Sequence, residues 1–361
     1  MTASLLNDYN PLTDEMVQVL SPEGEVVRPE LMPNWSNEQI KEAYATMVFL
    51  RMADTKISKL QRQGRCGTYA SIEGQEACQI GSGLMLDKKD WVFPAFRELG
   101  ISYVHGMPLD TFLVYWMGNE WGSNHSACVA PPSIPVGSHM LHAAGYAWAM
   151  KMQKKSHITI SYFGDGATSE GDFYEALNFA GVFKIPTILF CQNNQWAISI
   201  PRSRQTAAKT LAQKAIAAGI PGIQVDGMDL FAVAAVTKFA VERARNGEGA
   251  TLIEAVAYRF GNHTTSDEAK KYRDPAEIEQ WRPRDPMIRL QKYLEKKGLW
   301  TAAWEEELQA AAEPKIAEAV EKAENHPVQT PAEIFDYMFE TLPPALVEQK
   351  TYLQSFYPEA H

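Results

Sequence analysis

The stretch H-I-T-I-S-Y-F-G-D-G-A-T-S-E-G-D-F-Y-E-A-L-N-F-A-G-V-F-K-I-P-T-I-L-F-C-Q-N-N-Q-W-A-I, residues 157–198, decides the fold of this chain. Residues 157–163 are a β-branched and aromatic run that ends at a glycine, which predicts a buried parallel strand. Apolar residues at helical spacing follow over residues 173–183, and Pro186 ends that helix. Residues 187–191 are a second apolar run. The stretch therefore predicts a strand, a turn, a helix and a second strand.

The turn of this unit carries the polar residues. Gly164, Asp165 and Gly166 predict a tight turn, and Ser169 followed three residues later by Asp172 predicts a capping-box-like helix start.

Two parallel strands joined by a helix end at the same edge of a sheet, where open α/β sheets bind ligands. Asp165 and the pair Asn193–Asn194 are therefore expected to lie close together. A carboxylate, an amide oxygen and a loop carbonyl suit Mg²⁺, with phosphate oxygens completing an octahedron. The N–H groups of Gly166 and Ala167 suit the phosphates themselves.

The bulk properties exclude several classes of protein. The 361 residues suffice for one large α/β domain or two ordinary ones, and the formal net charge is −10. A surface that binds nucleic acid or an anionic membrane is basic, so neither partner is expected. Residues 1–10 lack the basic and apolar regions of a signal peptide, and no apolar run is long enough to span a bilayer. The four cysteines form no C-x-x-C pair, and we expect a reduced, cytoplasmic location.

The remaining segments alternate between strand and helix, which predicts a doubly wound, mostly parallel α/β sheet. Residues 1–35 are a polar, proline-containing N-terminal arm, which either packs on a partner subunit or is loosely held. Residues 36–275 form the α/β domain, and residues 276–361 form a C-terminal helical extension packed on it, whose tail beyond Leu342 is expected to wrap a partner. Further helices are expected at residues 36–63, 74–87, 143–151, 211–219 and 230–246, and further strands within residues 91–100, 219–229 and 251–260.

The motif G-D-G followed by N-N at this spacing resembles the thiamine pyrophosphate motif. Residues 164–180 resemble the alpha subunit of the pyruvate (2-oxo acid) dehydrogenase decarboxylating component of the two-subunit bacterial type. The resemblance covers roughly residues 36–342 and implies the thiamine pyrophosphate-binding fold with thiamine pyrophosphate and Mg²⁺ as cofactors. Other motifs agree in order: G-Q-E-A (74–77), F-R (96–97), I-P-V-G (134–137), and N-H-T-T-S-D (262–267) with Y-R (272–273).

The resemblance assigns cofactor-binding roles residue by residue. Arg97 would grip the diphosphate with its planar fork, although the residue alone is also compatible with a surface salt bridge. Phe96 stands where the family usually has tyrosine, so it is carried over only as a packing residue. Backbone groups at Ile134 and Val136 would hold the aminopyrimidine ring, with the Val136 side chain beneath the ring junction; without the resemblance both read equally well as core residues. The role of His139 stays open.

The resemblance also assigns the metal and an active-site loop. The metal ligands would be Asp165, Asn194 and the backbone carbonyl of Trp196, while Asn193 orients the loop. His263 would lie over the diphosphate and act in catalysis, because a histidine can donate a proton near neutral pH; taken alone, it is also readable as an exposed bystander. The residues matching the family's loop-ordering positions are Arg259, Asp267, Tyr272 and Arg273.

The implied activity is oxidative decarboxylation of pyruvate, with transfer of the acetyl group to the lipoyl domain of a dihydrolipoyl acyltransferase. In the family a beta subunit supplies the glutamate that activates the cofactor, so the implied assembly is α2β2. The alternative within the class is a branched-chain 2-oxo acid or acetoin dehydrogenase.

Two hypotheses come from other classes. A nucleotide-binding dehydrogenase requires G-x-G-x-x-G and an acidic residue ending the next strand, but Ser169 stands at the third glycine position and the strand ends in Asn-Asn. A non-catalytic scaffold subunit would have lost Asp165, Asn194 or His263, and all three are present.

Overall fold

The computed structural model describes residues 9–13 and 15–357. Its main sheet has five strands, all parallel, in the order β1-β2-β3-β7-β6. Every residue of β3 is buried, as expected of a strand covered on both faces. The strands are β1 (Trp91–Phe93), β2 (Thr159–Gly164), β3 (Thr187–Asn193), β6 (Gly222–Asp226) and β7 (Thr251–Val256), and a short antiparallel pair is formed by β4 (Trp196–Ala197) and β5 (Ile200–Pro201).

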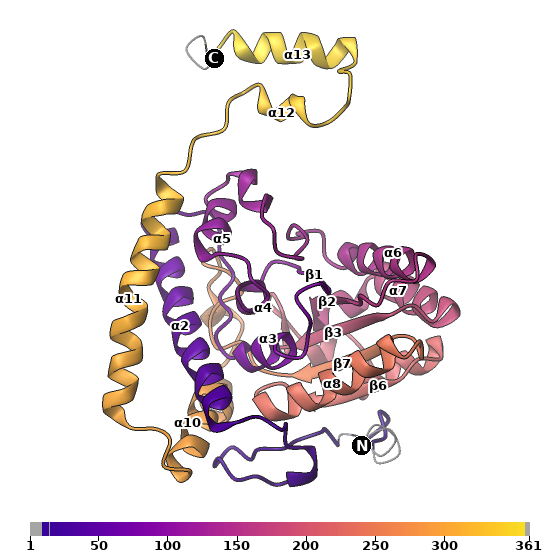
Figure 1. Ribbon diagram of the computed structural model, residues 1–361, viewed down its shortest axis with the longest axis vertical. Coiled ribbons are helices and arrows are strands. Elements are labelled where there is room, and N and C mark those ends of the chain that lie inside the picture. Colours follow the sequence, from indigo (N-terminus) through magenta and orange to yellow (C-terminus); the bar gives the residue numbers. More distant parts are fainter. Residues whose placement is uncertain (1–8, 14, 358–361) are drawn as a thin grey trace.

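Helices cover both faces of this sheet (Figure 1). One face packs on α6 (Ser138–Met152), α7 (Gly171–Phe183) and the 3₁₀ helix η5 (Ala212–Ala218), and the other on α3 (Glu76–Gly83) and α8 (Leu230–Arg245). From β1 to β3 the chain adds strands in one direction across the sheet, whereas from β6 to β7 it moves in the other direction. Because both kinds of crossover are right-handed, α8 lies on the face opposite α7. The predicted doubly wound sheet is thereby confirmed.

The other helices form a layer beside the sheet, in which α2 packs along α11 (Figure 1). Ser36 and Gln39 form a reciprocal capping box at the start of α2, which fixes where that helix begins. These helices are α2 (Asn37–Arg62), α4 (Leu99–Val104), α5 (Leu109–Trp116), α9 (Pro275–Trp281), α10 (Pro286–Lys296) and α11 (Ala302–Glu324); the 3₁₀ helices are η1 (Pro29–Leu31), η2 (Glu120–Ser123), η3 (Asp165–Ser169), η4 (Arg202–Arg204), η6 (Ala269–Lys271) and η7 (Arg282–Arg284).

The described part of the N-terminal arm packs on the chain's own sheet. Val17 forms a parallel bridge with Val225 at the outer edge of β6, and Val19 and Leu20 donate their backbone N–H groups to the Asp229 carboxylate. Covering an edge strand in this way protects its unpaired backbone groups. The arm is therefore not a loosely held terminus over these residues; residues 1–8 and 14 lie outside the described part.

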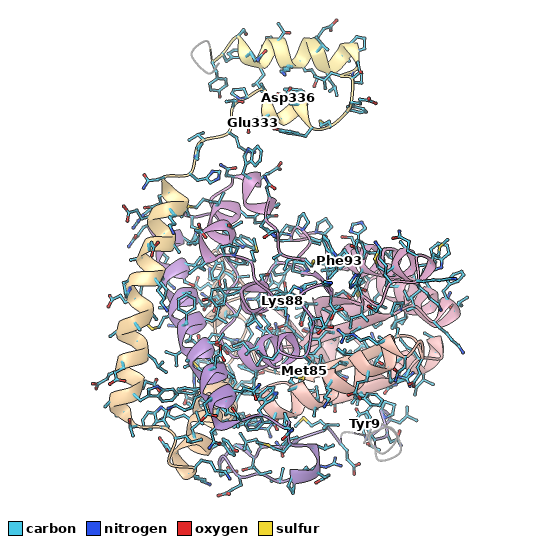
Figure 2. The ribbon with its side chains drawn as sticks, in the orientation of Figure 1. Tyr9, Met85, Lys88, Phe93, Glu333 and Asp336 are labelled. Carbon is cyan, nitrogen blue, oxygen red and sulfur yellow. The ribbon has the colours of Figure 1, made fainter. Side chains whose placement is uncertain are left out.

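The C-terminal segment is set apart from the body of the molecule, with α12 (Glu333–Asp336) and α13 (Pro344–Gln354) at one end (Figures 1 and 2). Glu333 accepts a 2.8 Å hydrogen bond from the indole N–H of Trp121, whose ring also meets Tyr337 edge-on. No residue of α13 is buried.

Two local predictions were wrong. Helix α7 begins at Gly171 with Glu170 as its N-cap and has no side-chain cap, because residues 165–169 are already wound into η3; Ser169 and Asp172 therefore form no capping box. The strand predicted to reach residue 260 ends at Val256. The helix predicted at residues 211–219 is present as the 3₁₀ helix η5. Across the described residues, no helix is long and apolar enough to cross a membrane.

Candidate active site

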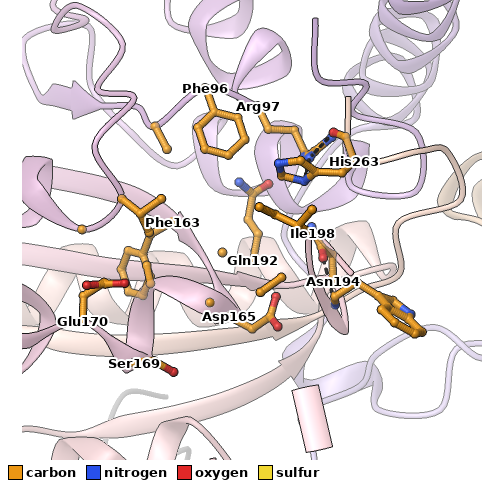
Figure 3. Close-up of a pocket in the computed structure, with 18 of the residues that line it drawn as sticks. Phe96, Arg97, Phe163, Asp165, Ser169, Glu170, Gln192, Asn194, Ile198 and His263 are labelled. Atoms are coloured by element: carbon orange, nitrogen blue, oxygen red, sulfur yellow. Dashed lines mark hydrogen bonds between the residues drawn. The ribbon is translucent and has the colours of Figure 1, made fainter. Parts of the chain in front are cut away.

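A pocket of about 590 Å³ opens at the carboxyl edge of the sheet (Figure 3). This volume is typical of sites for small molecules and cofactors. It collects most of the predicted site residues, although they come from five separate segments of the chain. The predicted residues that line it are Phe96, Arg97, Ile134, Val136, Asp165, Gly166, Ala167, Asn194, Trp196 and His263.

Asp165 and Asn194 meet because their strands are in register. Gly164 at the end of β2 pairs with Gln192 of β3, so Asp165 and Asn194 both follow strand ends at the same edge. The amide oxygen of Asn194 accepts the backbone N–H of Trp196 at 3.3 Å. Asn193 instead turns away and donates to the buried Glu254 carboxylate at 2.7 Å, which holds the loop.

The Asp165 carboxylate is buried, and it accepts a 2.9 Å hydrogen bond from Gln205. Burial raises the pKa of this carboxyl group to about 6, against smaller opposing effects that include the charge of Arg259. The nearby charges of Arg259 and Arg202 offset the burial only in part, so a bound cation would relieve the remaining cost of burying the charge.

The surroundings of Asp165 fit a metal ion held jointly with phosphate rather than one held by protein side chains alone. Over the described residues, no cluster of three or more His, Cys, Asp or Glu side chains could hold a metal. The candidate donors are one carboxylate, the Asn194 amide oxygen and the Trp196 carbonyl, a hard-oxygen set suited to Mg²⁺ once phosphate oxygens are added. Gly164 also lines the pocket, and a Cβ at that position would meet no protein atom within 4 Å, so that part of the pocket is left open.

Arg97 supplies positive charge on the opposite wall. Its guanidinium donates to the Ser71 carbonyl at 2.6 Å and to the His263 carbonyl at 2.7 Å, which fixes the side chain. Burial, together with the neighbouring Arg259, lowers the pKa of Arg97 to about 10. The acceptors that contact this buried guanidinium are neutral carbonyl and imidazole groups, so it keeps a positive charge suited to binding an anion.

His263 lies between these two arginines. Nη2 of Arg97 and Nη1 of Arg259 approach its Nδ1 at 3.2 and 3.4 Å. Arginine only donates, so Nδ1 must be the acceptor and the proton of the neutral ring lies on Nε2. Burial and the two positive charges lower the pKa of His263 to about 4. The ring is therefore neutral near pH 7, and Phe96 meets it edge-on.

The four predicted loop-ordering residues hydrogen-bond within the segment that carries His263. The Asp267 carboxylate accepts the His263 backbone N–H at 2.7 Å and the Tyr272 hydroxyl. Arg259 donates to the Tyr272 hydroxyl at 2.9 Å, and Arg273 donates to the carbonyls of residues 259, 260 and 261. Together they fix the loop's backbone.

Ile134 and Val136 are about half exposed and line the pocket, so they are not core residues. His139 is buried at the start of α6, where its Nε2 donates to the Tyr162 carbonyl at 2.6 Å. Burial lowers the pKa of His139 to about 4. This contact is that of an interior histidine holding α6 to β2.

Sequence reasoning missed several polar residues of the pocket. Gln75 lies within the G-Q-E-A motif, which could have pointed to it, whereas nothing in the sequence singled out Gln205. Glu98 accepts from Gln192 at 2.7 Å and from the Arg97 backbone N–H at 2.8 Å, and both side chains are buried and line the pocket. Burial raises the pKa of Glu98 to about 7. Glu170 is an exposed carboxylate at the rim.

Comparison with known proteins decides the family. The family model described as "Dehydrogenase E1 component" matches residues 44–332. The chain belongs to the dehydrogenase E1 component family. It is 45% identical over 340 residues to the pyruvate dehydrogenase E1 component subunit alpha of Staphylococcus aureus, covering 93% of this chain and 91% of that protein. The subunit of the same name from Staphylococcus epidermidis is 44% identical with the same coverage.

Membership of the dehydrogenase E1 component family confirms the resemblance drawn from the motifs. The family implies a thiamine pyrophosphate-dependent oxidoreductase. The nucleotide-binding alternative is thereby left without support.

Proposed function

We propose that this chain is the alpha subunit of an α2β2 component that oxidatively decarboxylates pyruvate and passes the acetyl group to the lipoyl domain of dihydrolipoyl acetyltransferase. The observation that carries this proposal is 45% identity, over 93% of the chain, to a pyruvate dehydrogenase E1 component subunit alpha. The relatives do not favour the branched-chain 2-oxo acid or acetoin alternative. The cytoplasmic location and the division at residues 35 and 275 stay predictions.

Thiamine pyrophosphate supplies, when bound, an electron sink for decarboxylation. Asp165, Asn194 and the Trp196 carbonyl hold Mg²⁺, and Arg97 with the backbone N–H groups of Gly166 and Ala167 binds the diphosphate. The donor set supports this assignment, as does the burial of the Asp165 carboxylate, which raises its pKa. The half-exposed Ile134 and Val136 support contacts with the cofactor rings.

His263 acts as a neutral donor through its Nε2–H. The two arginines that face Nδ1 fix this tautomer, and Asp267 with Tyr272 fixes the loop. The low pKa of the ring supports donation of a hydrogen bond to a developing negative charge, rather than a standing positive charge, at neutral pH.

A beta subunit completes the site. The carboxylate of Glu98 is held by hydrogen bonds from Gln192 and from the Arg97 backbone N–H, and we assign activation of the cofactor to a glutamate of the beta subunit. The C-terminal segment also exposes apolar side chains, as surfaces that bind partners do. These residues are Ile334, Tyr337, Met338, Phe339, Tyr352 and Phe356.

The experiment is steady-state turnover by the chain co-expressed with a beta subunit, supplied with a lipoyl domain and with either pyruvate or a branched-chain 2-oxo acid. We expect reductive acetylation of the lipoyl domain with pyruvate as the preferred substrate. Preference for the branched-chain acid would reject pyruvate as the substrate, and no decarboxylation of either acid would reject the proposed function.

A further inference from the structure

Gln75 is a buried pocket residue whose contacts bear on Asn194. The side chain is 1% exposed, and its amide oxygen accepts the Nδ2–H of Asn194 at 3.3 Å. Gly74 permits this approach, because its φ is +93° and a Cβ there would lie 2.2 Å from the Tyr258 carbonyl oxygen. The residues just before α3 therefore pack closely against the residues that follow β7, beside the loop that carries Asn194.

The contact with the Trp196 backbone determines which atom of the Asn194 amide is the oxygen, and the contact with Gln75 follows from it. The Trp196 backbone N–H needs an acceptor and therefore faces Oδ1, while the Gln75 oxygen faces Nδ2. An asparagine can bind a hard cation only through its oxygen. The Trp196 N–H therefore opposes the flipped amide, in which nitrogen would take the place of the metal-binding oxygen, and Gln75 holds the other side of the amide by accepting from Nδ2.

Gln205 makes the corresponding contact with Asp165. Its Nε2 donates to the Oδ2 atom of that carboxylate at 2.9 Å, and both residues line the pocket. The bond holds one carboxylate oxygen and leaves Oδ1 for another ligand. Gln205 follows η4, in a segment remote from Gln75 in the sequence, so the two glutamines reach the metal side of the pocket independently.

We propose that Gln75 and Gln205 are positioning residues that orient the two side-chain metal ligands, Asn194 and Asp165, for an ion of octahedral geometry. This inference rests on the proposed function, since it requires that the pocket bind Mg²⁺ with a diphosphate. Residues that hydrogen-bond to a metal ligand fix its orientation, and losing one lowers metal affinity by about 10- to 100-fold.

The test is a calorimetric measurement of the apparent Kd for Mg²⁺, and separately for Ca²⁺, at saturating thiamine pyrophosphate in the chain assembled with its beta subunit. Gln75→Met removes the acceptor while keeping the side-chain length, and Gln205→Met removes the donor. We expect each to weaken Mg²⁺ binding by about tenfold. The loss for Ca²⁺ is expected to be smaller, because Ca²⁺ tolerates irregular coordination and Mg²⁺ does not.

Matched variants separate positioning from general damage. Gln75→Glu keeps an acceptor oxygen and should bind Mg²⁺ no more weakly than the unchanged protein, and Gln309→Met on the outer helix α11 should leave both constants unchanged. Equal losses for Mg²⁺ and Ca²⁺, or Mg²⁺ binding by both methionine variants at unchanged strength, would overturn the proposal. If the unchanged assembly itself shows no Mg²⁺-dependent binding of thiamine pyrophosphate, the proposed function fails instead. Gln205 is only partly buried, so its variant tests the proposal even if Gln75→Met fails to fold.

Discussion

The two walls of the pocket carry opposite charge and are built in different ways. The metal wall holds Asp165 and Asn194 directly after the adjacent strands β2 and β3, so one stretch of sequence supplies both ligands. The cationic wall holds Arg97 from a loop after β1 and His263 from the chain after β7, and Arg259 contacts His263 without lining the pocket. The first wall follows from a local motif, and the second exists only once distant segments have folded together.

The walls also differ in how their buried charges are balanced. Burial raises the pKa of Asp165 on one wall and lowers the pKa values of Arg97 and His263 on the other. Burial is the largest cause of each shift, and the charge of Arg259 opposes the shift of Asp165 but adds to the shifts of Arg97 and His263. A magnesium diphosphate would relieve both walls at once, which is why a pocket with this division suits it.

The largest effect is expected on the metal wall. Asp165→Ala removes a metal ligand. Loss of a residue that only hydrogen-bonds to a ligand lowers metal affinity by about 10- to 100-fold, and loss of the ligand itself should cost more. Affinity for thiamine pyrophosphate with Mg²⁺ should therefore fall by more than about 100-fold. Calorimetry of the assembled protein measures it, with the exposed Glu175→Ala on α7 as the control. Retained affinity would remove the metal wall from the site.

The next effect is expected at His263 on the cationic wall. His263→Ala removes the Nε2–H donor, so kcat should fall by about 100-fold or more, the usual cost of one preorganised donor. Cofactor affinity should change far less, which a titration of the same sample checks. A variant with unchanged kcat would make the histidine a bystander.

Arg97 should affect binding rather than turnover. Arg97→Lys keeps the charge but loses the planar fork that donates to Ser71 and His263. A hydrogen bond to a charged group is worth about 1.5–3 kcal/mol, so the Kd for thiamine pyrophosphate should rise by about 10- to 100-fold. Full affinity in the lysine variant would show that charge alone suffices on this wall.

A pH titration compares the walls without a mutation. Below about pH 6 the Asp165 carboxyl is protonated and must release its proton before it can ligate Mg²⁺, whereas above that pH it is already ionised. Affinity should therefore increase as pH rises through about 6 and level off above it. Calorimetry in buffers of different ionisation enthalpy detects the released proton, and Asp165→Asn should remove that part of the pH dependence.

The smallest effect is expected at Phe96, which meets the His263 ring but carries no hydroxyl. Phe96→Tyr adds a donor beside the diphosphate wall, and one net hydrogen bond of about 0.5–1.5 kcal/mol would tighten binding by about 2- to 10-fold. Weaker binding would mean that the hydroxyl points away from the diphosphate.

The difference between the walls also explains which parts of the fold and of the site could be predicted from the sequence. Residues 157–198 predicted β2, α7, β3 and the proximity of Asp165 to Asn194, because hydrophobic period and strand direction are local properties. The cationic wall was named only through resemblance, since no local pattern says that Arg97 meets His263. Gln205 was missed for the same reason, and the cap at Ser169 failed because η3 uses those residues.

The most direct single measurement is a calorimetric titration of thiamine pyrophosphate, with and without Mg²⁺, into the chain assembled with a beta subunit. We expect binding that requires Mg²⁺ and that the chain alone does not support. Tight binding without any divalent cation would contradict the division into a metal wall and a cationic wall. Absence of binding in the assembled protein would contradict the assignment of the pocket to thiamine pyrophosphate.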